Sequence, residues 1–80
     1  MKGLLSKLKR EIEILNLSKK TAKAYLFYVG NFLMYAKNKG LNKNIVKDFV
    51  QLEIRRKDPS TVSSEISAIK FFFEKVLTQV

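Results

Sequence analysis

The sequence predicts an all-α fold, a compact four-helix orthogonal bundle formed by a single domain of 80 residues. Apolar residues recur at three- and four-residue spacing along four segments, and short breaks rich in Asn, Gly, Ser and Pro separate these segments. The run "STVSS" is the one competing strand signal, and the Asp-Pro helix start before it outweighs it. We expect helices over about residues 2–15, 19–38, 43–56 and 59–78.

The first two expected helices are each defined by an apolar stripe. The first stripe consists of Leu4, Leu5, Leu8, Ile12 and Leu15, and "NLS" ends it. The second helix begins after the N-cap Ser18 and is closed by "NKG" at Gly40. Its inner face consists of Ala22, Tyr25, Leu26, Val29, Phe32, Leu33 and Ala36.

The third and fourth expected helices meet at "RRKDPS". Asn42 or Asn44 caps the third helix, whose inner residues are Ile45, Val46, Phe49, Val50 and Leu52. Asp58 caps the fourth helix, with Pro59 at the first helical position, where a missing N–H costs nothing. The inner side of this helix consists of Thr61, Val62, Ile66, Ile69, Phe72, Phe73, Val76 and Leu77.

The composition argues against an enzyme. The chain has no histidine and no cysteine, so the commonest general base, the commonest metal ligand and every thiolate ligand are missing. Seven carboxylates are scattered along the chain, and their spacing indicates no convergent acid pair. We therefore expect no catalytic, metal-binding or cofactor-binding residues.

Hydropathy indicates a cytoplasmic protein that does not enter a membrane. The longest uncharged run, residues 24–36, is shorter than the roughly 18–20 residues that cross a bilayer. The beginning, "MKGLLSKLKR", is interrupted by charges too often to serve as a signal peptide.

The charge of the chain points to an anionic partner. The net charge is +9, and residues 16–40 contain five lysines and no acid. A small basic domain of this kind usually meets a polyanion, of which nucleic acid is the first choice and an anionic membrane the second.

The second helix has an unusual outer face. Lysines follow the N-cap Ser18 directly, where the helix dipole favours acids. With the free N–H groups of the first turn, these lysines could hold a phosphate. The outer face consists of Lys19, Lys20, Lys23, Phe27, Asn31 and Met34. The alternative is an ordinary solvated face with a slightly unfavourable helix start.

The fourth helix has an outer face of Ser60, Ser63, Ser64, Ser67 and Lys70. Serine is a mediocre helix former, so four serines in eight residues need a reason. Small hydroxyls allow close approach to phosphates or base edges, and tight packing against a neighbouring helix is the alternative.

Phe27 and Phe71 lie off the inner stripes and are interpreted as contacts to another domain or protomer. Basic residues 55–57 are favourable at a helix C-terminus in any case.

The order and spacing of these elements resemble a known family. "LSKKTAKAYLFYVGNFLMYAKNKG", followed after about twenty residues by "STVSSEISAIKFFFEKVL", resembles the N-terminal core-binding (SAM-like) domain of tyrosine recombinases, the phage-integrase and Xer-like family. The resemblance covers nearly the whole chain. It rests on Ser18, Thr21, Tyr25, Phe32, Leu33 and Gly40, and on Ser60, Thr61, Ser67, Ala68, Ile69, Lys70, Phe72 and Phe73.

The resemblance implies a SAM-like bundle that clamps double-stranded DNA at a recombination site through its second and fourth helices. It also implies two further partners: a C-terminal catalytic domain of the same parent chain, and neighbouring protomers in a synaptic tetramer. Strand cleavage and rejoining would belong to that catalytic domain, which we expect this chain to lack. The expected DNA-binding residues are Ser18, Lys19, Lys20, Thr21, Lys23, Phe27, Asn31, Ser60, Thr61, Ser63, Ser64, Ser67 and Lys70.

A different class of function stays open at this point. The chain could instead be a small basic helical adaptor that binds a protein partner or an acidic membrane surface through its first helix. The sequence does not distinguish integration, excision and dimer resolution, and it does not reveal a DNA target.

Overall fold

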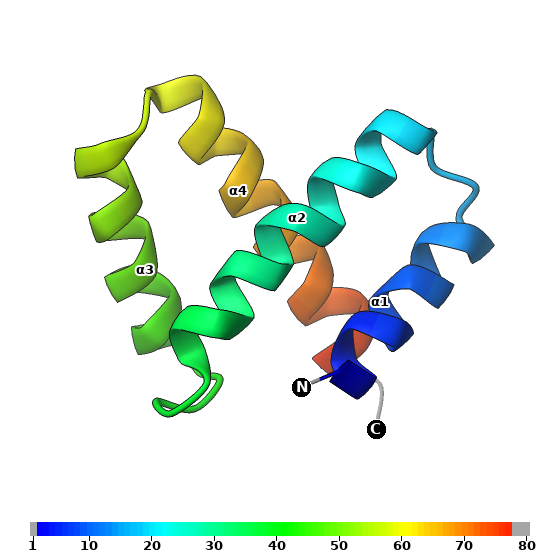
Figure 1. The fold of residues 1–80 in the computed structure, drawn as a ribbon, viewed down its shortest axis with the longest axis horizontal. Coiled ribbons are helices and arrows are strands. Elements are labelled where there is room, and N and C mark those ends of the chain that lie inside the picture. Colours follow the sequence, from blue (N-terminus) through cyan, green and yellow to red (C-terminus); the bar gives the residue numbers. More distant parts are fainter. Residues whose placement is uncertain (1, 78–80) are drawn as a thin grey trace.

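A computed structural model describes residues 2–77 of the chain. These residues form α1 (Lys2–Ile14), α2 (Lys19–Ala36), α3 (Lys43–Arg56) and α4 (Pro59–Phe72), and a π-helical turn, η1 (Phe73–Leu77), continues α4 (Figure 1). No strand occurs in this part of the chain. The predicted all-α, four-helix bundle is confirmed.

The helices form two thin layers. α2 crosses over α4, while α1 and α3 lie on opposite sides of this crossing (Figure 1). The shortest dimension of the Cα trace is 17 Å, which two packed helix layers account for. Because α2 and α4 pack on each other, their neighbouring polar residues come together on one surface.

The core lies where α2 crosses α4, closed by α1 and η1 at one end and by α3 at the other. Phe32 and Phe72 are its largest fully buried apolar side chains, and Phe32 meets Phe49 of α3 edge to face at 5.5 Å between ring centroids. Leu8 of α1 and Val76 of η1 are buried in the same cluster. In α2 the predicted inner stripe is confirmed, since all its members are buried or packed against this core.

The helix ends follow the predicted capping residues. Ser18, Asn42 and Asp58 each accept a hydrogen bond from the backbone N–H three residues later, and Pro59 occupies the first turn of α4. Asn16 adopts a left-handed conformation with φ of 54°, which ends α1. Gly40, with φ of 89°, closes the turn after α2.

Some predicted boundaries differ slightly from the structure. The first helix ends at Ile14 rather than 15, because the Asn16 turn begins there. The second ends at Ala36 rather than 38, because the Lys39 and Gly40 N–H groups both bond the Ala36 carbonyl. The fourth changes to π geometry after Phe72, and its predicted end at residue 78 lies outside the described residues.

Three predicted core residues are exposed, which corrects the inner stripes of three helices. Leu15 is 45% exposed because it follows the last residue of α1. Leu52 and Ile66 are 42% and 41% exposed, because Glu53 and Glu65 turn inward at these points instead. Burial of these two acids is costly, and Lys57 forms an ion pair with each of them, as described below.

Phe71 also differs from its predicted role. Its ring contacts the ring of Tyr25 of α2 at a tilt of 50°, with 5.1 Å between centroids, and it packs against the core. Phe71 therefore has a partner within this chain, and the prediction that it lies off the inner stripe is wrong. Its contact with another domain or protomer stays a prediction. Within residues 2–77, every helix is too short or too polar to cross a membrane.

Candidate nucleic-acid interface

The start of α2 is built by a local hydroxyl pair. Ser18 Oγ accepts a hydrogen bond from the Thr21 N–H at 3.2 Å, and the Ser18 hydroxyl donates to Thr21 Oγ1 at 3.0 Å. The first turn contains no acid, while Lys19, Lys20 and the following Lys23 are exposed. Several positive charges thus surround the positive end of the helix dipole, which makes this end attractive to an anion.

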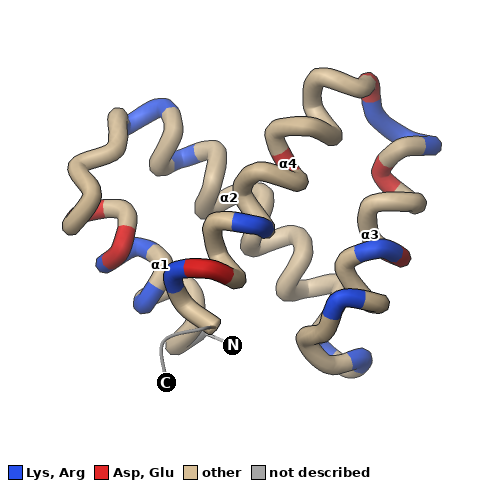
Figure 2. The backbone as a smooth tube through the Cα atoms, turned by 180° about the vertical axis from the view of Figure 1, so that it is seen from behind, with Lys and Arg blue, Asp and Glu red and all other residues tan. Residues whose placement is uncertain are grey.

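The outer face of α4 carries hydroxyls and little charge. Ser60, Ser63, Ser64 and Ser67 are all exposed, and the Ser64 hydroxyl donates to the Ser60 carbonyl at 3.3 Å. Seen from behind, the α4 tube is tan over most of its length, while two blue segments mark the lysines at the beginning of α2 (Figure 2). Exposure contradicts the alternative that these serines serve tight helix packing, so folding does not explain them.

A groove joins the two helices, and we call it the hydroxyl groove. It has a volume of about 380 Å³. Its lining consists of Lys20, Thr21, Ala24, Tyr25 and Tyr28 from α2, and of Ser63, Ser64 and Ser67 from α4. The lining includes hydroxyls and one ammonium but no carboxylate. This combination suits a phosphate, which accepts several hydrogen bonds and carries negative charge.

Other predicted site residues lie around this groove rather than in it. Lys70 lines a neighbouring groove of about 410 Å³ between α3 and α4, which shares Ser63 and Ser67 with the hydroxyl groove. Asn31 lines a third groove, of about 320 Å³, between α2 and α3. The site residues thus extend over one continuous side of α2 and across α4.

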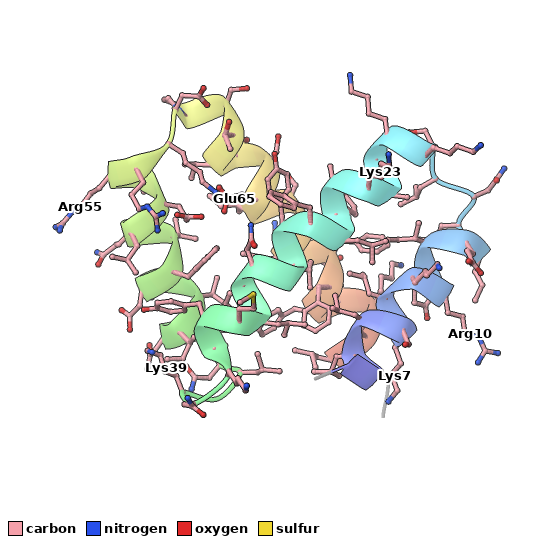
Figure 3. All side chains as sticks on the ribbon, in the orientation of Figure 1. Lys7, Arg10, Lys23, Lys39, Arg55 and Glu65 are labelled. Atoms are coloured by element: carbon pink, nitrogen blue, oxygen red, sulfur yellow. The ribbon has the colours of Figure 1, made fainter. Side chains whose placement is uncertain are left out.

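Six of the predicted residues lie outside all three grooves: Ser18 and Ser60, described above, and four others. Lys19 and Lys23 are exposed near the start of α2, where Figure 3 shows Lys23. Phe27 is 63% exposed and touches Tyr28 edge to face at 5.7 Å. Thr61 is half-buried, and its N–H donates to Asp58 Oδ1 at 2.7 Å, so its main role is in the start of α4.

Sequence reasoning missed a polar cluster beneath this surface, which we call the ion-pair cluster: Glu53, Lys57 and Glu65. Lys57 Nζ lies 2.9 Å from Glu53 Oε1 and 3.3 Å from Glu65 Oε1. The Glu65 side chain, located between α3 and α4 in Figure 3, is only 1% exposed. Two carboxylates therefore converge on one lysine, and the expectation that no acid pair would converge is wrong.

The three charges shift one another's pKa values. Burial and the adjacent Glu53 raise the pKa of Glu65, against the opposing effect of Lys57. Burial also opposes the ionisation of Glu53, yet the hydrogen bond from Lys57, the neighbouring Glu65 and the charge of Arg56 lower the pKa of Glu53 overall. The hydrogen bond to Glu53 raises the pKa of Lys57. Relative to the isolated side chains, the cluster thus favours the neutral form of Glu65 and the charged forms of Glu53 and Lys57.

The ion-pair cluster fixes the corner between α3 and α4. The Lys57 N–H donates to the Glu53 carbonyl at 2.8 Å, and the next residue, Asp58, caps α4. The backbone hydrogen bond from Thr61 lowers the pKa of Asp58, so this cap is ionised at neutral pH. Lys57 thus holds α4 at its angle to α3, which distinguishes it from the exposed Arg55 and Arg56 beside it.

Within residues 2–77, no group of three or more carboxylates is gathered in a way that could hold a metal ion. In the ion-pair cluster the ammonium of Lys57 takes the position that a cation would need between Glu53 and Glu65.

Fold and surface together define the class of protein: an all-α, SAM-like four-helix domain with a basic, hydroxyl-rich face over α2 and α4. A family model described as "Phage integrase, N-terminal SAM-like domain" matches residues 4–80. The chain belongs to this family, and the resemblance noted from the sequence is confirmed. No curated protein and no solved structure gives a significant match.

Proposed function

We propose that the chain is the core-binding domain of a tyrosine recombinase and holds duplex DNA at the recombination site through α2 and α4. The observation that carries this proposal is the hydroxyl groove, in which Lys20 and Thr21 of α2 meet three serines of α4 without a carboxylate in the lining. Family membership supports a role in an integrase, and the net charge of +9 supports a polyanionic partner.

The lysines and the hydroxyls of this face have different roles, which follow from their chemistry. The lysines at the start of α2 neutralise backbone phosphates, while the hydroxyls of α4 donate to phosphate oxygens at short range. Small serine side chains allow the α4 backbone to approach the DNA closely. The domain positions the parent protein on its site, and we assign strand cleavage and rejoining to a separate C-terminal catalytic domain. The sequence after Val80 in the parent gene tests this assignment, because it should contain that domain.

A duplex titration with charge-reversed variants tests DNA binding. The double change Lys20→Glu with Lys23→Glu removes two phosphate contacts and adds repulsion, so we expect at least a tenfold loss of affinity at low salt. The matched control is Lys43→Glu with Lys47→Glu, which changes the net charge equally at the beginning of α3, another helix without an acid in its first turn. Equal losses in the two variants would mean that only net charge matters and that the proposed face is wrong.

The salt dependence of the unaltered chain gives a second reading from the same titration. With about four to six phosphate contacts, raising salt from about 50 to 200 mM should lower the affinity by about a hundredfold to a thousandfold. An affinity that stays flat over this range would contradict phosphate neutralisation.

A second candidate function rests on the end of α1. Ile14 is 66% exposed, and Leu15 beside it is also exposed, so this end offers an apolar contact surface. It favours the adaptor alternative, in which α1 binds a protein partner or an acidic membrane surface. Co-sedimentation with anionic lipid vesicles separates the two functions: an adaptor of the membrane kind pellets with vesicles and loses this on Ile14→Ser, whereas the DNA-binding domain retains its duplex affinity in that variant.

A further inference from the structure

The groove between α2 and α3 combines side chains of a different kind from those of the hydroxyl groove. Asn31 and Met34 of α2 face Arg56 and Glu53 of α3 across it. Asn31 and Arg56 are 25 positions apart in the chain and come together because α2 and α3 pack side by side. An amide and a guanidinium in one groove are the two groups most used to recognise purine edges in the major groove.

The two grooves lie along the same side of α2. Lys20, Ala24 and Tyr28 line the hydroxyl groove, and Asn31, one turn further, lines the groove with Arg56. Spacings of three and four residues place these positions in one row on a helix. The row from Lys20 to Asn31 is about 16 Å long at 1.5 Å per residue, so one short DNA segment can contact both grooves.

The charged groups of the second groove differ from those of the hydroxyl groove. Glu53 and Lys57 both line it and are paired at 2.9 Å, so their charges largely offset each other. Arg56 therefore lies beside an ion pair that includes a carboxylate, a setting that favours a phosphate less than the carboxylate-free hydroxyl groove does, whereas a base edge carries no net charge. The adjacent Arg55 provides a contrast, because its side chain points away from the body of the domain (Figure 3) and lines a groove on another side of α3.

We propose that Asn31 and Arg56 determine the sequence specificity of this domain, with Asn31 binding an adenine edge and Arg56 a guanine edge in the major groove. This rests on the proposed DNA-binding function. The hydroxyl groove then holds the backbone, and the α2–α3 groove recognises bases beside it. Each bidentate contact fixes one base pair, so the preferred sites contain a guanine and an adenine at fixed separation.

Selection from a duplex library with a randomised centre tests the assignment, followed by competition titrations of the preferred duplex against its single-base variants. Arg56→Lys retains the charge but loses the planar fork that binds guanine at two points. We expect this change, and Asn31→Ala, each to lower the discrimination at one base pair by roughly fivefold to a hundredfold. Affinity for unrelated duplexes should stay within about twofold for Arg56→Lys, because phosphate neutralisation is unchanged.

The matched controls are Arg55→Lys and Asn38→Ala, which should leave the base preference intact; circular dichroism melting confirms that each variant is folded. The assignment is overturned if Arg56→Lys and Arg55→Lys have the same preference as the unaltered chain. It is also overturned if the chain binds all duplexes equally, and this result would leave the proposed function standing. Failure to bind any duplex at low salt would instead remove the proposed function, and the base-reading assignment with it.

Discussion

The two faces of α4 use polar residues for opposite purposes. On the inner face Glu65 is buried and paired with Lys57 at 3.3 Å, so its chemistry belongs to folding. On the outer face Ser60, Ser63 and Ser67 are exposed and lower the helix propensity of the segment. The comparison teaches that a polar residue is a functional candidate when the fold gains nothing from it.

The largest effect is expected on the inner face. Lys57→Met leaves Glu53 and Glu65 buried without their cation, and we expect it to lower the free energy of unfolding by about 3 kcal/mol. Urea denaturation followed by circular dichroism measures this. The control is the triple change Lys57→Met, Glu53→Leu and Glu65→Leu, which removes all three charges together and should restore most of the stability. A Lys57→Met protein as stable as the parent would show that Lys57 does not stabilise the buried acids Glu53 and Glu65.

The pH dependence of stability provides a second test of the buried acids on the inner face of α4. Because the folded pKa of Glu65 is raised above its ordinary 4.5, the native state binds the extra proton, and stability falls as pH rises from 4.5 through the folded pKa. The slope from this one proton is at most about 1.4 kcal/mol per pH unit. Glu53 has the opposite sign: its pKa is lowered, so its contribution is lost as pH falls below 4.5.

Thermal melts at a series of pH values, compared between the parent and Glu65→Gln, measure this contribution. The substitution should abolish the part of the fall in stability above pH 4.5 that Glu65 causes. The melting temperature of the parent should therefore fall more steeply with pH than that of Glu65→Gln. Parallel curves for the two proteins would mean that Glu65 titrates normally in the folded state.

The smallest effect on stability, and the one of opposite sign, is expected on the outer face. Ser63→Ala with Ser67→Ala should raise the free energy of unfolding by about 0.5 kcal/mol per site, because alanine is the better helix former and neither serine is buried. The same protein should bind duplex DNA about tenfold more weakly, since two donors to the DNA are removed. Urea denaturation and duplex titration of one preparation measure both, and a loss of stability would place these serines with the fold instead.

Much of the fold was predictable because apolar spacing and capping residues are local signals. Ser18 and Asp58 mark helix starts whose geometry depends on three following residues, and both predictions are confirmed. The register of α4 could also have revealed Glu65, since it continues the inner row of Val62, Ile69 and Phe72 at three- and four-residue spacing. The assumption that apolar Ile66 must be inside, and an acid outside, hid this signal.

The residues of the candidate site were predictable from the sequence, but the contacts between residues of different helices were not. Helix position alone separates the serine face of α4 from its core face, so the sequence identifies Ser63 and Ser67. It does not identify Arg56 as the neighbour of Asn31, or Lys57 as the partner of Glu65, because both depend on how helices cross. Besides the register of Glu65, the Glu53–Lys57 spacing of four residues was a local indication of the ion-pair cluster.

The most direct test of the central claim is to record amide chemical shifts of the isotopically labelled chain by NMR while a duplex is added at low salt. If the polar face of α2 and α4 binds DNA, the largest shift changes occur at residues 18–28 and 60–70, and Ile14 and Leu15 at the end of α1 are unaffected. Shift changes concentrated at the end of α1, with the serines of α4 unmoved, would contradict the claim.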